Sequence, residues 1–157
     1  MIKTNAMRLL DAAKIKYTAA EYEYKEDDLS GLHAAAFLQI PPEQFFKTLV
    51  LRGSKKGFFV CCIPVHKELD LKKAAAAMGD KSAEMLHVKE LLSTTGYIRG
   101  GCSPIGMKKR FPTFFDASVH ELESVYISAG TRGCALCVNS EALLSYISAQ
   151  TFALTNP

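Results

Sequence analysis

The most regular pattern of apolar and polar positions in this 157-residue chain is a pair of apolar runs joined by a short polar segment. Residues 45–52 and 58–63 are rich in aromatic and β-branched side chains, and the segment 53–57 between them reads Gly-Ser-Lys-Lys-Gly. This arrangement predicts a β-hairpin. The second run is apolar on both of its faces, which is typical of a central strand.

Helix-capping residues followed by apolar positions at helical spacing predict helices on both sides of the hairpin. The capping residues are Thr4, Ser30, Asp70 and Ser140. The helices expected after the first two caps end before Tyr17 and before Pro41. Those after the last two cover 71–78, with Gly79 as the terminating glycine, and 141–147; one more lies around 88–92.

The remaining apolar runs predict short strands at 17–24, 113–115, 125–128 and 134–138. Strands in the middle of the chain, with helices between and around them, predict an α+β fold without the regular alternation of a doubly wound sheet. A length of 157 residues and a hydrophobic content of 48% suit one core, so we expect a single domain spanning 1–157.

The composition favours a cytoplasmic protein. No apolar run approaches the length that a membrane crossing needs, and residues 1–5 lack the long apolar core of a signal peptide. The five cysteines are an odd number, and two of them are adjacent at Cys61 and Cys62, which is unlike a secreted disulfide framework. We therefore expect reduced thiols in a reducing compartment.

The charged residues are distributed unevenly, although the net charge is only +3. The window 21–28 carries five acids and one lysine, so the rest of the chain holds 18 of the 19 bases and 11 of the 16 acids. This basic surplus can attract a polyanion in a salt-dependent way. An ordinary solvated surface is the alternative. Attraction of a polyanion would be strongest if several of the bases lie on one face of the protein. These bases are Arg52, Lys55, Lys56, Lys108, Lys109 and Arg110.

Three glycines and a proline fall within seven residues at 100–106, which read Gly-Gly-Cys-Ser-Pro-Ile-Gly. Glycine permits positive φ and close approach to the main chain, while proline fixes its own φ and restricts the residue before it. The segment is therefore a shaped loop that can point backbone N–H groups at a ligand, beside the basic residues 108–110. A tight connection with a solvated basic tip is the alternative.

Lys47 is the unusual residue of the first apolar run. Because side chains alternate along a strand, Phe45, Lys47, Leu49 and Leu51 share one face. A lysine on such a face either extends to an edge or enters a cavity, where its ammonium group needs carbonyl or anionic partners. In the second case the cation could hold a substrate or stabilise charge in a transition state.

The cysteines and histidines form no recognisable catalytic or metal-binding group. Cys134 and Cys137 lie three positions apart in a predicted strand and therefore face opposite sides, so we expect them to pack in the core. Only Cys102, in the glycine loop, is expected near a ligand. The four histidines are scattered without a metal-ligand spacing, so we expect no metal and no cofactor. They are His33, His66, His87 and His120.

An ordered set of short motifs resembles the YbaK/EbsC family over nearly the whole chain. The motifs are Phe46-Lys47-Thr48-Leu49, Leu69-Asp70-Leu71-Lys72-Lys73, Thr95-Gly96-Tyr97 leading into the loop 100–106, Lys108-Lys109-Arg110, and Ser128-Ala129-Gly130-Thr131-Arg132-Gly133. The resemblance implies a curved, mixed central sheet, partly barrel-like and surrounded by helices. It also implies an aminoacyl-tRNA deacylase related to the editing domain inserted in bacterial prolyl-tRNA synthetases, whose free-standing members act notably on Cys-tRNA(Pro).

The resemblance also implies roles for individual residues. Lys47 is expected to engage the substrate near its ester or terminal adenosine, and the backbone N–H groups of the loop 100–104 are expected to hold the ester carbonyl or its oxyanion. The catalytic set is therefore Lys47, Gly100 and Gly101. The substrate-binding set is Tyr22, Thr48, Ser103, Pro104, Ser128, Gly130 and Arg132. Relatives often carry an acidic residue shortly after the Arg-Gly pair, whereas residues 134–136 read Cys-Ala-Leu here.

The motifs contain no evident protein nucleophile, which leaves the substrate as its source. The resemblance implies that the substrate's own thiol attacks its ester to give a cyclic thiolactone. Positioning of such an intramolecular attack can lower a barrier by roughly 7–11 kcal/mol. Expected partners are mischarged tRNA and prolyl-tRNA synthetase, without a membrane, in a monomer or weak dimer. The alternatives are a deacylase for Ala-tRNA(Pro) or another small aminoacyl-tRNA that activates water, a non-catalytic module that binds tRNA or a synthetase, and a small-molecule binder.

Overall fold

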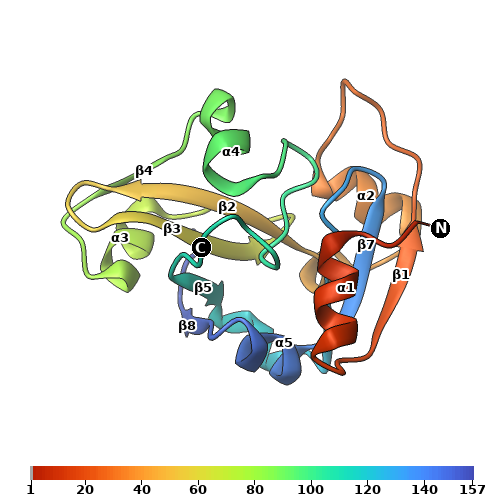
Figure 1. Cartoon of the computed structure of the whole chain (residues 1–157). Coiled ribbons are helices and arrows are strands. Elements are labelled where there is room, and N and C mark those ends of the chain that lie inside the picture. Colours follow the sequence, from red (N-terminus) through yellow and green to blue (C-terminus); the bar gives the residue numbers. More distant parts are fainter. Residues whose placement is uncertain (1) are drawn as a thin grey trace.

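Two β-sheets lie side by side in the computed structural model, which describes residues 2–157 (Figure 1). The larger sheet has the strand order β4-β2-β3-β5-β8 and the smaller one β1-β7-β6. The larger sheet comprises β2 (Phe46–Gly53), β3 (Gly57–Pro64), β4 (Ala83–Met85), β5 (Thr113–Asp116) and β8 (Gln150–Phe152). The smaller one comprises β1 (Tyr17–Glu21), β6 (Ser124–Ser128) and β7 (Cys134–Asn139).

Five α-helices and two 3₁₀ turns are distributed around the sheets within this part of the chain. The helices are α1 (Asn5–Ala12), α2 (Gly31–Leu38), α3 (Leu71–Met78), α4 (Val88–Thr95) and α5 (Ser140–Tyr146). The turns are η1 (Pro42–Gln44) and η2 (Ala117–Glu121). No helix within residues 2–157 is long and apolar enough to cross a membrane. The structure thus confirms an α+β architecture.

The predicted caps account for most helix boundaries. Thr4 accepts a hydrogen bond from the backbone N–H of Met7, and Ser30 and Asp70 cap α2 and α3 in the same way. The cap predicted for the last helix is wrong by one residue, because the side chain of Asn139 accepts the bond from Ala142 and Ser140 is the first helical residue. Asn and Ser are both good caps, so sequence alone does not separate two that are adjacent.

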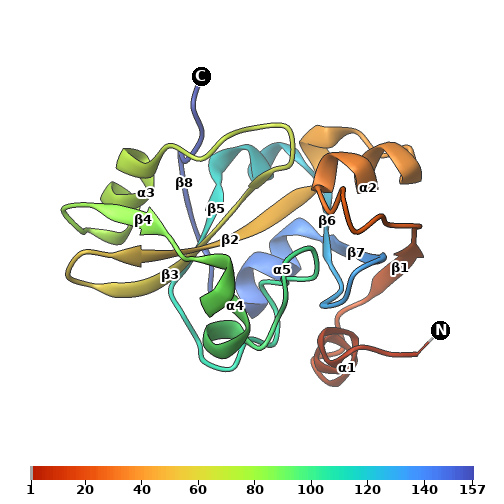
Figure 2. The same cartoon turned by 90° about the horizontal axis from the view of Figure 1, so that it is seen from above.

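The predicted hairpin is confirmed as β2 and β3. The two strands pair antiparallel from Phe46 opposite Pro64 to Gly53 opposite Gly57. β3 also pairs with β5, which makes it the central strand that its apolar sequence indicated. In Figures 1 and 2 the hairpin extends away from the smaller sheet toward the opposite end of the molecule.

The strands predicted at 113–115, 125–128 and 134–138 are confirmed within one residue as β5, β6 and β7, but other short strands depart from expectation. β1 ends at Glu21 rather than at residue 24, and β8 was not predicted at all. β8 is three residues long and pairs in parallel with β5. A strand so short carries no recognisable alternation, and its conformation follows from its partner rather than from its own sequence.

The main hydrophobic core lies between the larger sheet, the smaller sheet and helices α1 and α5. Phe46 and Phe115 stack in it with ring centroids 5.7 Å apart. The two sheets are linked by an isolated bridge between Phe45 and Tyr126. The expected partly barrel-like closure is not confirmed, because the structure describes two sheets rather than one continuous strand order.

Candidate functional site

A cavity of about 520 Å³ lies beside the first half of β2. Its walls are β2, the segment 27–34 that enters α2, the connection from β4 to α4, and the glycine loop. Its volume falls in the range of roughly 300–1,000 Å³ that is typical of small-molecule sites. A larger and more open depression of about 890 Å³ lies between Asp11 and Thr18 and around Asn139, but none of the predicted site residues lines it.

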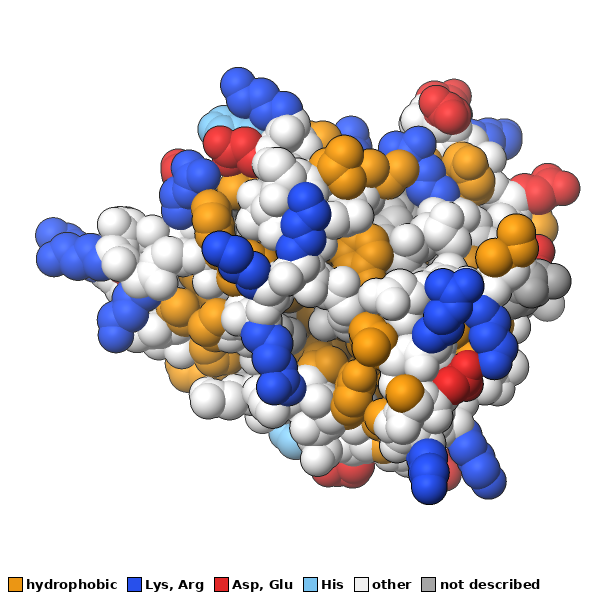
Figure 3. All heavy atoms as spheres, viewed as in Figure 1, with side chains coloured by type: hydrophobic (Ala, Val, Ile, Leu, Met, Phe, Trp, Pro, Cys, Tyr) orange, Lys and Arg blue, Asp and Glu red, His pale blue; other side chains and the backbone are white. Residues whose placement is uncertain are grey.

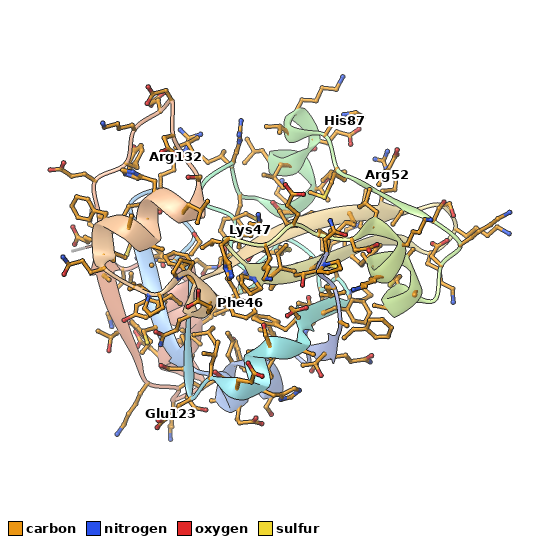
Figure 4. All side chains as sticks on the ribbon, turned by 180° about the vertical axis from the view of Figure 1, so that it is seen from behind. Phe46, Lys47, Arg52, His87, Glu123 and Arg132 are labelled. Carbon is orange, nitrogen blue, oxygen red and sulfur yellow. The ribbon has the colours of Figure 1, made fainter. Side chains whose placement is uncertain are left out.

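Lys47 lies in this cavity, half-buried, between the ends of the hairpin and the smaller sheet (Figure 4). Its neighbours on the same strand face, Leu49 and Leu51, pack against a separate hydrophobic cluster with Phe59. Burial lowers the pKa of Lys47, and the charge of Glu68 opposes that shift. Among residues 2–157 the ammonium group has neither a salt bridge nor a hydrogen bond, so it is free to bind an anionic or carbonyl group.

The glycine loop lines the same cavity with two residues, Gly100 and Cys102. Gly100 has a φ of 87°, which favours glycine. Neither of their N–H groups has a hydrogen-bond partner in the described part of the chain. The N–H of Gly101 is already used, since it donates to the carbonyl of Ile98 at 3.0 Å.

A second turn, residues 128–133, packs against the glycine loop. A Cβ atom on Gly101 would lie only 3.1 Å from the backbone of Thr131, so the two turns pack main chain against main chain. The Nε of Arg132 donates to the carbonyl of Arg99 at 2.9 Å. The hydroxyl of Tyr97 donates to the carbonyl of Ile105 within the loop. These contacts hold the loop in one shape.

Half of the predicted site residues line the cavity. They are Tyr22, Lys47, Thr48, Gly100 and Ser128. The other half lie outside its lining, and they are Gly101, Ser103, Pro104, Gly130 and Arg132. The first three of these are buried within the loop, so their contribution in this structure is to its shape. Arg132 braces the loop through its bond to Arg99.

Sequence reasoning missed two kinds of cavity residue. The first is a pair of carboxylates, Asp27 and Asp28, together with Arg99 at the rim. The acidic window 21–28 was visible in the sequence, but nothing there indicated that it lies beside β2. The second kind is a set of apolar side chains on separate elements. They include Leu29, Leu32, Met85 and Val88.

Cys102 in the cavity lining, and the buried pair Cys61 and Cys62 in β3, argue against a protein thiolate. Burial raises the pKa of Cys102 to about 12 and the pKa of Cys61 also to about 12, and it raises the pKa of Cys62 further. These thiols are therefore protonated near neutral pH. Hydrogen bonds from Ser30 lower the pKa of Asp28, so this carboxylate is ionised. Within residues 2–157 no three His, Cys, Asp or Glu side chains form a group that could hold a metal ion.

Two comparisons by sequence assign the chain to a family. The family model for the aminoacyl-tRNA editing domain matches residues 32–146. EbsC of Enterococcus faecalis (strain ATCC 700802 / V583), named as a candidate Cys-tRNA(Pro)/Cys-tRNA(Cys) deacylase, is 48% identical over 153 residues, which cover 98% of this chain and 93% of EbsC. A proline–tRNA ligase of Thermosipho africanus (strain TCF52B) is 35% identical over 75 residues, 48% of this chain and 13% of the ligase.

Solved structures share the fold over almost the whole chain. The crystal structure of a candidate trans-editing enzyme for prolyl-tRNA synthetase superposes with a TM-score of 0.81 at 23% identity and covers 100% of both chains. That of the hypothetical protein APE2540 gives 0.85 at 19% identity, with 95% and 97% covered. The expected resemblance and enzyme class are thereby confirmed, and the chain belongs to the aminoacyl-tRNA editing domain family, in which YbaK and EbsC are found.

Proposed function

We propose that this protein is a trans-editing deacylase that removes cysteine from mischarged Cys-tRNA(Pro). One observation carries the proposal: Lys47, whose ammonium is unpaired among the described residues, lines one cavity together with Gly100 and Cys102, two loop residues whose N–H groups are also unpaired there. The similarity to EbsC supports a cysteinyl ester as the substrate. The similarity to part of a proline–tRNA ligase supports tRNA(Pro) as its carrier and the synthetase as a partner in the cytoplasm.

The N–H groups of Gly100 and Cys102 are the donors that we assign to the ester carbonyl. Donors fixed in advance stabilise the oxyanion that forms there without reorganising, and loss of one such donor typically costs about 10²–10³ in turnover. The bracing by Tyr97 and Arg132 supports this assignment, because it fixes the loop before substrate binds. Gly101 then acts as a spacer that lets the two turns pack closely.

Lys47 supplies positive charge in the same cavity. Its ammonium group can bind a phosphate oxygen of the terminal nucleotide or stabilise negative charge at the ester, and partial burial lowers its pKa. Asp27 and Asp28 supply negative charge at the mouth, where the α-ammonium group of the aminoacyl ester can bind. They can take the place of the acidic residue that relatives often carry shortly after the Arg-Gly pair, where residues 134–136 are Cys-Ala-Leu in this chain.

The chemical step that fits these groups uses the thiol of the esterified cysteine. Its sulfur attacks the ester carbonyl carbon, the bond from that carbon to the ribose oxygen breaks, and the thiol proton ends on the released ribose hydroxyl. The products are uncharged tRNA and a cyclic thiolactone, which water then hydrolyses to cysteine. The protein contributes position and oxyanion stabilisation, and positioning alone can account for roughly 7–11 kcal/mol of barrier lowering.

Deacylation of tRNA(Pro) charged with cysteine, alanine, serine or 2-aminobutyrate tests this function. 2-Aminobutyrate lacks the thiol and is otherwise close in size to cysteine, so we expect cysteine to be released at least roughly ten-fold faster. Mass spectrometry should detect the thiolactone. Equal release of both would show that water is the nucleophile, and preferential release of alanine would overturn the cysteine assignment. Binding of tRNA without any hydrolysis would identify a non-catalytic module.

A further inference from the structure

The outer edge of β2 has unpaired peptide groups inside the cavity. In an antiparallel strand, the N–H and C=O of alternate residues point to the same side. The carbonyl of Phe45 accepts from Val65 on the β3 side, whereas the carbonyl of Val50 accepts from Leu86 on the β4 side. Thr48 therefore points its N–H and C=O away from β3, and β4 pairs with β2 only at residues 51–53.

The gap at this edge is too short for an added strand. At one end Leu86 donates to Val50 at 3.0 Å, and α4 begins two residues later. At the other end Phe45 bridges to Tyr126 of β6. In between, Phe46 and Thr48 point their N–H and C=O outward. Phe46 lies directly beside the bridge to Tyr126, so Thr48 is the residue at the centre of the gap. The edge therefore suits one planar group that offers one acceptor and one donor, rather than a peptide that continues the sheet.

Apolar side chains stand around this edge without being buried themselves. Leu32 on α2 is 48% exposed, Met85 in β4 is 42% exposed, and Val88 at the start of α4 is 61% exposed. All three line the cavity. Figure 3 shows hydrophobic side chains interspersed with Lys and Arg side chains on one face of the molecule. Exposed apolar groups that face one cavity indicate a ligand with a flat apolar surface.

We propose that the peptide group of Thr48 binds the Watson–Crick edge of the adenine that ends the tRNA, an inference that rests on the proposed function. The N–H donates to adenine N1, and the C=O accepts from the 6-amino group. Leu32, Met85 and Val88 pack against the faces of the ring. This places the ribose ester of the same nucleotide toward Lys47 and Gly100, which line the same cavity.

Minihelices charged with cysteine by a ribozyme, and differing only in the terminal base, test the inference. Inosine presents a donor and an acceptor in reversed positions, so both bonds fail, and we expect kcat/KM to fall roughly ten-fold or more. Purine, which lacks the amino group, should lie between inosine and adenine. 7-Deazaadenine keeps the Watson–Crick edge and should be processed like adenine. Equal rates for all four bases would overturn the inference, whereas no hydrolysis of the adenine substrate would overturn the proposed function instead.

A protein variant tests the N–H separately. Proline is tolerated in an edge strand where the N–H points outward, so Thr48→Pro removes the donor with little demand on the fold. Thr48→Val keeps the N–H and removes the hydroxyl, so it is the matched control. A terminal 1-deazaadenine should be slower than adenine for the wild type and for Thr48→Val, but equal to adenine for Thr48→Pro. An unchanged ratio in a folded Thr48→Pro variant would contradict the assignment; if this variant does not fold, the base series decides.

Discussion

At the residue scale, Lys47 is a partly buried positive charge that lowers the stability of the folded state. A half-buried ammonium without a partner among the described residues destabilises the protein, and its lowered pKa expresses this. Such a residue is retained where function needs it. The sequence predicted its strand face from simple alternation, but it could not decide between a cavity and a solvent-exposed edge.

We expect Lys47→Met to reduce deacylation of Cys-tRNA(Pro) roughly ten-fold or more, because it removes the cation and keeps the aliphatic stem. The melting temperature should stay the same or rise. Lys73→Met is the control, since Lys73 donates to the carbonyl of Thr155 and lies outside the cavity lining. Near-normal turnover of Lys47→Met would show that Lys47 has no part in the reaction. A melting temperature several degrees lower would show that Lys47 stabilises the fold.

At the element scale, the parts that sequence predicted are those with local causes. The hairpin and the helices that begin at Thr4, Ser30 and Asp70 follow from alternation and capping within a few residues. β8 could not be predicted, because only its pairing with β5 makes it a strand. The site divides in the same way. Lys47 and the glycine loop stand out in the sequence, whereas Asp27, Leu32 and Val88 meet only through the tertiary fold.

The hairpin turn is held by a carboxylate from outside the hairpin. Asp80 accepts hydrogen bonds from the hydroxyl of Ser54 and from the backbone N–H groups of Lys55 and Lys56, at 2.7 to 3.0 Å, and from that of Lys81 at 2.6 Å. Burial alone would raise the pKa of Asp80, but these bonds together lower it well below its usual value of 3.8. The carboxylate therefore stabilises the folded state when ionised.

We expect Asp80→Asn to lower the melting temperature at pH 7 by roughly 2–4 °C, a typical effect of losing one such interaction in a protein of this size. A carboxyl group with a lowered folded-state pKa contributes stability above its unfolded-state value and loses it as the pH falls toward the folded-state value. The difference between the wild type and Asp80→Asn should therefore shrink below about pH 4. Thermal unfolding from pH 7 to pH 3 measures it, with Asp27→Asn as the control. A difference that does not change with pH would contradict the mechanism.

At the scale of the whole molecule, the basic surplus is placed where it can guide a polyanion. Arg99 lies at the cavity rim, while Lys109 and Arg110 line a separate depression of about 380 Å³ on the other part of the glycine loop. Figure 3 shows Lys and Arg side chains spread over one face of the molecule. The glycine loop therefore connects the cavity to Lys109 and Arg110, and we expect a tRNA whose end enters the cavity to bring phosphates near Arg99 and this basic pair.

We expect the double substitution Lys109→Gln and Arg110→Gln to raise KM for Cys-tRNA(Pro) and to leave a short substrate, the cysteinyl ester of adenosine, unaffected. Removing one phosphate-binding side chain should reduce the slope of log K against log salt by about 0.7–0.9, so the slope should change by about one to two. The control removes the same charge at the hairpin tip, with Lys55→Gln and Lys56→Gln, and should change neither quantity. Equal effects of both double variants would mean that net charge rather than position attracts the tRNA. An equal fall in activity on the short substrate would instead place Lys109 and Arg110 in the chemistry of the loop.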